Sequence, residues 1–149
     1  MSLALLNLTS QSRPIRAWQM TAEQRRRERV IEGLAIQRCL AEADKQEKPL
    51  NLRRTVRRAN ESGGIVEHIV QRRPRRWYWR AESGAYFIQV LYDGEAVALS
   101  KGKATVECAD IAALIAAMDV LEAATRAGEL DVGLAKIAEA SRRIKKKAA

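Results

Sequence analysis

The sequence predicts an α+β fold, in which an antiparallel β-meander of four to five strands is followed by helices and preceded by a basic N-terminal helix. Two patterns support this expectation. Through residues 52–108, β-branched and aromatic residues alternate with turn signals, which is typical of short antiparallel strands. Before and after this stretch, apolar residues recur at helical spacing. The chain has 149 residues, which suits one domain of this class.

The first helix is expected to begin at Thr21. Thr21 and Gln24 have the spacing of a capping box, in which each side chain satisfies an amide that the helix start leaves free. An apolar stripe that includes Val30 and Leu34 continues the helix until shortly before Pro49. Arginines crowd its first turns, namely Arg25, Arg26, Arg27 and Arg29. Since the helix dipole disfavours positive charge there, these arginines either meet an anion or form a solvated face beside neighbouring glutamates.

The strands follow from turn signals that separate runs of β-branched and aromatic residues. Residues 60–64, Asn-Glu-Ser-Gly-Gly, form a turn signal between the two strands of a hairpin, and Asp93-Gly94 is the strongest hairpin signal in the chain. We expect the first hairpin at 52–58 and 65–71, and further strands at 77–79, 86–92, 96–99 and 104–108. Alternation along one strand places Tyr86, Ile88, Val90 and Tyr92 on one face and Phe87, Gln89 and Leu91 on the other.

Two helices are expected after the strands. Asp110 is a favourable N-cap before an apolar repeat, and Gly128 is a natural stop. A last helix is predicted from about Asp131 to Arg142, followed by a frayed basic tail. The chain is therefore expected to divide into an N-terminal basic helical arm (1–50), an antiparallel sheet with its packing helix (51–129), and a C-terminal helix with a basic tail (130–149).

Charge is unevenly distributed along the chain. The net charge is +9 and the isoelectric point is about 10.1, which favours a polyanionic partner: nucleic acid first, and an anionic membrane surface second. Residues 50–80 contain nine arginines and two glutamates, whereas residues 81–131 contain nine acidic and three basic residues. No stretch approaches the roughly 20 apolar residues that a spanning helix needs. We expect nucleic acid and no membrane as the partner, and a cytoplasmic location in a bacterial or phage-infected cell.

The sequence offers little for catalysis. His68 is the only histidine, so no imidazole cluster can form around a metal or a nucleophile, and no glycine-rich phosphate loop is present. Cys39 and Cys108 lie far apart in the sequence and are expected to be small buried apolar residues in a reducing compartment. We expect a protein that is not an enzyme and that uses no metal or cofactor.

The run from Arg72 to Arg80 combines five arginines with Trp77, Tyr78 and Trp79. Guanidinium groups form paired hydrogen bonds with phosphates, and flat rings stack on unpaired bases for about 1–3 kcal/mol each. Base pairs in a duplex hide these faces, so the combination favours single strands or RNA over B-form DNA. Under the alternative interpretation, Trp77 and Trp79 fill the core beneath a helix. Tyr78 lies on the opposite face of the predicted strand and is the better stacking candidate.

The predicted hairpin is also basic. A ribbon with several arginines can lie along a phosphate backbone and bind it without sequence preference; the alternative is a solvated arm whose charge only aids solubility. The binding hypothesis requires that the arginines between Leu50 and Arg80 gather on one exposed surface. The residues expected to bind nucleic acid are Arg53, Arg54, Arg57, Arg58, Arg72, Arg73, Arg75, Arg76, Tyr78, Lys101 and Lys103.

A family resemblance rests on residues 83–94, on Leu99–Val106 with its Lys101-Gly102-Lys103 turn, and on the apolar helix after Asp110. Over about residues 64–127 the chain is similar to the core of the positive-cofactor-four and Whirly-type single-stranded-DNA-binding proteins. The resemblance implies a homodimer paired through its helices and a basic groove with aromatic residues for single strands. Lys101 and Lys103 match the basic turn of that family. The chain also resembles an uncharacterised family of short bacteriophage and prophage proteins.

We therefore expect a non-catalytic protein that binds single-stranded DNA or RNA and acts in phage or bacterial DNA metabolism or transcription. The alternative is a phage-encoded inhibitor or adaptor that binds a host protein of a nucleic-acid-handling complex. The acidic segment 81–131 and the separate N-terminal helix favour this alternative.

Overall fold

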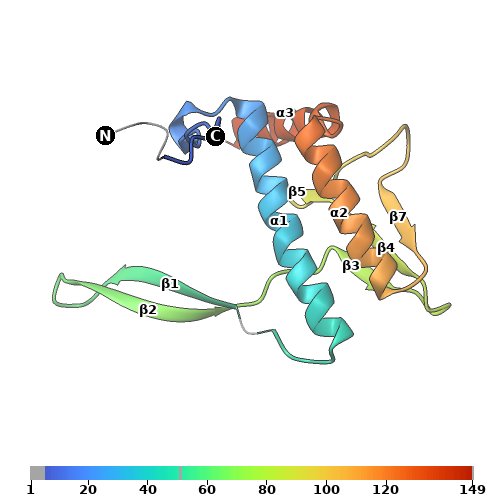
Figure 1. Cartoon of the computed structure of the whole chain (residues 1–149). Coiled ribbons are helices and arrows are strands. Elements are labelled where there is room, and N and C mark those ends of the chain that lie inside the picture. The colour runs from blue at the N-terminus through green and yellow to red at the C-terminus, as the bar shows by residue number, and fades with distance from the viewer. Residues whose placement is uncertain (1–5, 51, 149) are drawn as a thin grey trace.

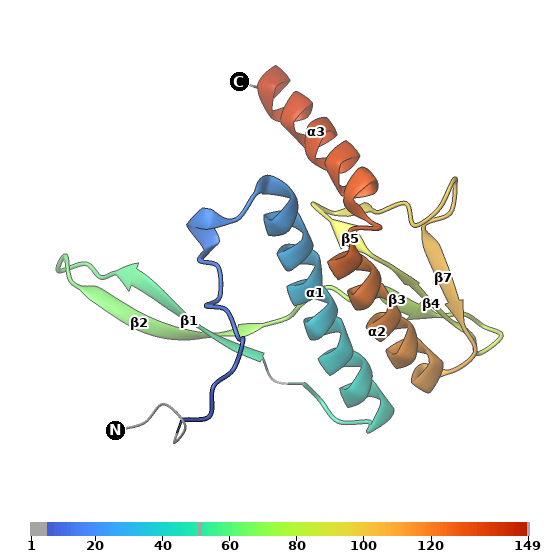
Figure 2. The same cartoon turned by 45° about the horizontal axis from the view of Figure 1, so that its top comes forward.

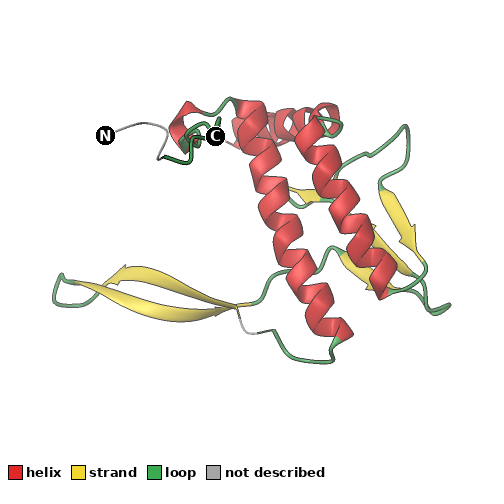
Figure 3. Ribbon diagram, in the orientation of Figure 1, coloured by secondary structure: helices red, strands yellow, loops and turns green. Residues whose placement is uncertain are grey.

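The computed structural model describes residues 6–50 and 52–148 and has the α+β fold that the sequence predicts. Figures 1 and 3 show two helices side by side, a small sheet, a third helix across one end, and a long hairpin that projects away from the rest. Helix α2 (Ile111–Ala127) packs on both α1 (Ala22–Lys45) and strands β4 (Tyr86–Gln89) and β7 (Thr105–Cys108). None of the helices in these residues combines the length and the apolar character needed to cross a membrane.

Helix α1 begins where its capping box predicts. The Thr21 hydroxyl accepts a hydrogen bond from the Gln24 amide at 3.2 Å, and the Gln24 side chain accepts one from the Thr21 amide at 3.0 Å. The expected division of the chain into a separate helical arm at 1–50 does not hold for this helix, because Val30 and Leu34 are buried in the same core as the sheet. Helix α1 therefore belongs to the body of the protein.

Two arginines near the start of α1 meet carboxylates of the body. Arg27 forms a hydrogen-bonded ion pair with Asp131, at the start of α3 (Asp131–Ala148). Arg29 pairs with Asp93 at 3.2 Å, and its guanidinium lies 5.2 Å from the centre of the Tyr92 ring. Partners from distant parts of the chain thus offset the unfavourable position of these charges on the helix dipole.

The strands form three separate sheets, and those after residue 80 are shorter than expected. Strands β1 (Leu52–Ala59) and β2 (Ile65–Arg72) form one hairpin. Strands β3 (Tyr78–Arg80), β4 (Tyr86–Gln89) and β7 (Thr105–Cys108) form a three-stranded antiparallel sheet in the order β3-β4-β7. Strands β5 (Leu91–Tyr92) and β6 (Glu95–Ala96) form a short pair.

The sheet order corrects the meander that the sequence suggested, because the last strand and not residues 96–99 lies beside β4. The Asp93-Gly94 turn forms as predicted, with positive φ at both residues. Pairing after this turn reaches only as far as Val97, whose amide donates to the Val90 carbonyl at 2.8 Å. The chain then leaves through a turn at Ser100–Lys103 and returns as β7.

One core joins the helices to the sheet. Ile88 from β4, Val90 between β4 and β5, Leu114 from α2 and Leu134 from α3 are fully buried. The predicted alternation of faces is confirmed, because Tyr86 and Tyr92 are packed against this core on the same side as Ile88. Cys108 is buried as expected, but Cys39 is exposed on α1.

The last two helices follow their local signals. The Asp110 carboxylate caps α2 by accepting from the Ala113 amide at 2.7 Å, and Gly128 ends that helix with a left-handed φ of 88°. Helix α3 runs on to Ala148, so the basic residues 142–147 are helical where a frayed tail was expected. Their position at a helix C-terminus is favourable for positive charge.

Candidate nucleic-acid interface

The β1–β2 hairpin, here called the arm (residues 52–72), projects away from the body in both views (Figures 1 and 2). Its strands are paired over eight residues each, from Leu52 opposite Arg72 to Ala59 opposite Ile65. Every residue of β2 is exposed, and in β1 only Leu52 and Val56 are partly covered. The arm is thus a ribbon with both faces open to solvent.

The tip of the arm is closed by local hydrogen bonds. The Asn60 side chain accepts from the Gly64 amide at 2.6 Å, and the Asn60 amide donates to the Gly64 carbonyl at 2.8 Å. Gly63 has a φ of 81°, a region that glycine enters without the steric cost that other residues meet. The turn predicted at 60–64 therefore forms and fixes the register of the ribbon.

The arm distributes its arginines over two faces, which corrects the expectation of a single basic surface. Side chains alternate along a strand, so the neighbours in Arg53-Arg54 and in Arg57-Arg58 point in opposite directions. Directly paired residues share a face, and the register assigns the arginines accordingly. One face, the three-arginine face, carries Arg54, Arg58 and Arg72; the other, the two-arginine face, carries Arg53 and Arg57.

Most of these arginines are available to a partner. Arg57 pairs with Glu67 at 3.2 Å on the two-arginine face, where the two residues lie directly opposite each other. Among residues 6–50 and 52–148, Arg53, Arg54, Arg58 and Arg72 have no ion pair. The three-arginine face contains no acidic residue. The arm therefore presents positive charge that the protein itself does not neutralise.

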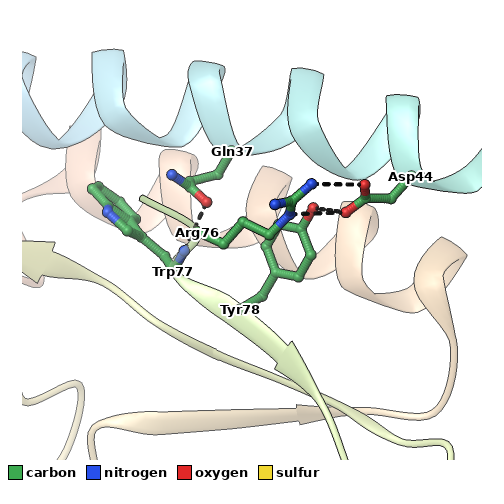
Figure 4. Close-up of polar contacts among 5 residues, drawn as sticks. All are labelled: Gln37, Asp44, Arg76, Trp77 and Tyr78. Atoms are coloured by element: carbon green, nitrogen blue, oxygen red, sulfur yellow. Dashed lines mark hydrogen bonds and ion pairs between the residues drawn. The ribbon is translucent and has the colours of Figure 1, made fainter. Parts of the chain in front are cut away.

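The base of the arm is held to α1 by a polar cluster (Figure 4). Two nitrogens of Arg76 donate to the two carboxylate oxygens of Asp44 at 3.0 and 3.2 Å, and the Tyr78 hydroxyl donates to the same carboxylate. Gln37 holds the chain between them, because its side chain accepts from the Trp77 amide at 2.8 Å and donates to the Arg75 carbonyl at 2.9 Å. This cluster fixes the segment that leaves the arm.

The structure contradicts the roles expected of Tyr78 and Arg76. Tyr78 is only 6% exposed and belongs to the core, so its ring has no face for a base. The register of the sheet explains this, because Tyr78 pairs with buried Ile88 and must share its side of the sheet. Arg76 is already paired with Asp44, so its charge is neutralised within the chain.

The two tryptophans of this segment have different surroundings. Trp77 packs against the core, and its ring lies so close to Gly33 of α1 that a Cβ there would be 2.3 Å from a ring carbon. Trp79 is 45% exposed and stacks on Phe87, with ring centres 5.8 Å apart, on the outer face of the sheet. The core interpretation is therefore right for Trp77 and wrong for Trp79.

The polar cluster shifts the ionisation of its members. Burial raises the pKa of Tyr78 well above its usual value, and the hydrogen bond to Asp44 raises it further. Burial alone would raise the pKa of Asp44, but the hydrogen bonds from Arg76 and Tyr78 outweigh it, and the pKa lies below its usual value. Asp44 is thus an anion and Tyr78 a neutral donor at physiological pH.

Replacing Asp44 by Asn is expected to lower the free energy of unfolding by about 1 kcal/mol at neutral pH, because hydrogen bonds from a guanidinium and a buried hydroxyl lose their charged acceptor. The expected change in free energy is modest because 35% of the Asp44 side chain is exposed and solvent screens its ion pair with Arg76. A carboxyl with a lowered pKa stabilises the fold above its unfolded pKa of about 3.9 and loses this effect as pH falls through the folded pKa.

The difference in stability between the wild type and Asp44→Asn should therefore shrink between neutral pH and about pH 3, below the unfolded pKa of an aspartate. Denaturant melts at both pH values measure it. Glu139→Gln is the matched control, because Glu139 forms an exposed pair with Arg143 at 2.8 Å on α3; such pairs contribute less than about 0.5 kcal/mol. A constant difference across this pH range would contradict the role given to the Asp44 carboxylate.

Two recesses lie beside the segment that connects the arm to β3. One, of about 280 Å³, is lined by residues that include Lys48, Arg72 and Arg73; the other, of about 320 Å³, includes Arg29, Arg75, Trp77 and Tyr92. Within the described part of the chain, Lys48, Arg73 and Arg75 have no ion pair. Lys48 was not among the predicted binding residues, and it reaches this position because the loop after α1 passes the base of the arm.

Lys101 and Lys103 are not brought near the arm. They lie in the connection between β6 and β7, which is at the opposite end of the molecule from the arm in both views (Figures 1 and 2). Of the predicted binding residues, the structure thus groups Arg53, Arg54, Arg57, Arg58, Arg72, Arg73 and Arg75 on or beside the arm. In the residues that the structure describes, no three His, Cys, Asp or Glu side chains are grouped to hold a metal ion.

Comparison with known proteins adds no assignment: no protein-family model matches the chain, and no curated protein or solved structure matches it.

Proposed function

We propose that the protein binds nucleic acid without catalysis, through the arm and the basic segment that follows it. The arginines do not share one surface, as the hypothesis drawn from the sequence required. The proposal rests instead on a single projecting ribbon that carries arginines without a carboxylate partner on both of its faces. The acidic residue of the strands, Glu67, lies opposite Arg57 and pairs with it, whereas the three-arginine face contains no acidic residue. An arm that served only for solubility would have no reason to keep one whole face free of acid. Guanidinium groups are the side chains best suited to phosphate oxygens.

The proposal predicts a strong dependence on salt. Six arginines of the arm and its base have no ion pair among residues 6–50 and 52–148: Arg53, Arg54, Arg58, Arg72, Arg73 and Arg75. Each phosphate that such a residue neutralises releases counterions, and six contacts give a slope of about −5 for log K against log salt. Affinity should then fall about 1000-fold between roughly 50 and 200 mM salt.

Fluorescence anisotropy with labelled oligonucleotides across this salt range tests the proposal. Binding at low salt with a steep slope is the expected result. If no oligonucleotide binds at low salt, or if binding is insensitive to salt, the proposed function is wrong. A pull-down from lysate before and after nuclease treatment separates it from a protein partner, since a partner that persists without nucleic acid would favour the adaptor role.

A further inference from the structure

We infer that the ligand of the arm is duplex DNA, and that the ribbon enters a groove with one face toward each phosphate backbone. This inference rests on the proposed function and specifies its ligand class. It differs from the preference for single strands that the sequence suggested, which rested on Trp77, Tyr78 and Trp79 and on the family resemblance. Tyr78 and Trp77 pack in or against the core, and Trp79 stacks on Phe87 in the sheet and not on the arm. The arm itself has to supply the recognition, and its composition and geometry suit a groove.

The first argument is the presence of free arginines on both faces. Arg54, Arg58 and Arg72 point to one side of the ribbon, and Arg53 points to the other together with Arg57. A ribbon that lay flat on one strand would contact phosphates with one face and leave the arginines of the other face in solvent. A groove of duplex DNA has a phosphate backbone on each side, so a ribbon inserted edge-first uses both faces.

The second argument is the absence of Phe, Tyr and Trp from the arm. Residues 52–72 contain no Phe, Tyr or Trp, whereas binders of single strands rely on aromatic side chains to stack the bases. In their place the arm exposes branched apolar residues, namely Ile65, Val66, Ile69 and Val70. All four lie on β2, so insertion of the β2 edge places them deepest in the groove, where they can contact the methyl groups and base edges of a duplex. The arginines of β1 then lie toward the phosphates at the mouth of the groove.

The third argument is size. The two strands of a ribbon lie about 4.8 Å apart, and a strand of eight residues is about 26 Å long. The major groove of B-form DNA is about 12 Å wide and 8.5 Å deep, which admits a two-stranded ribbon. The major groove of an RNA duplex is too narrow and deep for side chains to read. The dimensions therefore favour DNA over RNA.

Glu61 is an acidic residue of the arm that has no ion pair among residues 6–50 and 52–148. It lies in the turn beyond the two strands, so it stands on neither of the faces that carry the arginines.

Binding of the full-length protein to a labelled DNA duplex, to one of its single strands, and to an RNA duplex of the same sequence tests the inference. The DNA duplex is expected to bind at least about tenfold more tightly than either alternative, a difference that base and groove contacts commonly produce. Equal or tighter binding of the single strand, or of the RNA duplex, would overturn the inference while leaving the proposed function intact. Failure to bind any of the three would overturn both.

Paired substitutions on the two faces test the orientation. Arg54→Ala/Arg58→Ala removes two arginines from the three-arginine face, and Arg53→Ala/Arg57→Ala removes both from the other. Each is expected to weaken duplex binding about tenfold or more and to reduce the salt slope by about 1–2. Arg126→Ala/Arg143→Ala removes the same charge from exposed pairs on α2 and α3 and should change affinity less than about threefold.

If only one of the two faces matters, the ribbon lies flat and the groove inference is wrong. The apolar side chains provide an independent readout, because their contacts do not release counterions. Ile65→Ser/Ile69→Ser should weaken duplex binding about tenfold with an unchanged salt slope. Thermal melts of each variant are expected to match the wild type, because these side chains are exposed or lie outside the core.

Discussion

Removal of the arm is expected to abolish nucleic-acid binding at physiological salt and to leave the body folded. Leu52 and Arg72 are paired across the base of the hairpin, so a short Gly-Ser turn can join them in place of residues 53–71. No residue of the arm belongs to the core cluster or packs against it. The melting temperature should therefore change by no more than a few degrees, as is usual when no buried contact is lost.

The loss of affinity should be at least about 100-fold, because the deletion removes three arginines without ion pairs and all of the exposed apolar residues of β2. Anisotropy measures the affinity, and circular dichroism with thermal melts measures the fold. Arg126→Ala/Arg143→Ala again controls for net charge. If the shortened protein binds as well as the wild type, the interface lies on the body; if it unfolds, the arm stabilises the core in a way that the contacts do not reveal.

Leu114→Ala is expected to lower the free energy of unfolding by about 3 kcal/mol, because it removes three carbons from a closely packed site and leaves a cavity. Leu114 is 0% exposed on α2, in the core that this helix shares with α1 and the sheet. The melting temperature should fall by roughly 10 °C for a chain of this length. Chemical denaturation monitored by tryptophan fluorescence is a suitable measurement.

Val120→Ala is the matched control on the same helix. Val120 is 68% exposed, so its truncation should change stability by less than about 0.5 kcal/mol. Equal effects of the two substitutions would show that α2 does not pack on the sheet as described. Because the arm contributes nothing to this core, Leu114→Ala should leave duplex affinity unchanged at a temperature where the variant is folded.

Features that depend on neighbouring residues could be predicted from the sequence. The capping box at Thr21, the cap at Asp110, the left-handed glycine at 128 and the Asp93-Gly94 turn all form as expected. Each involves residues within a few positions of one another, so the local chemistry decides the outcome. The arm was predicted for the same reason, because its turn and its two strands are consecutive.

Features that depend on pairing between distant segments could not be predicted. Tyr78 and not Trp79 faces the core, because Tyr78 pairs with Ile88. In a strand of three residues, no local pattern tells which side chains point inward and which point outward. A shift of one residue moves every side chain to the other face. The partner of Arg76 lies 32 positions earlier, on α1. The separation of Lys101 and Lys103 from the arm likewise follows from the position of β7 in the sheet.

The Gln37 side chain donates to the Arg75 carbonyl and accepts from the Trp77 amide, and it thereby attaches the segment after the arm to α1. These bonds lie three and five residues after Arg72, so they fix the point on the body from which the second strand of the ribbon departs. Two molecules joined through their bodies would then present their ribbons at a set separation. Sites recognised on a double helix would be expected at a matching interval, in whole turns of about 10 base pairs.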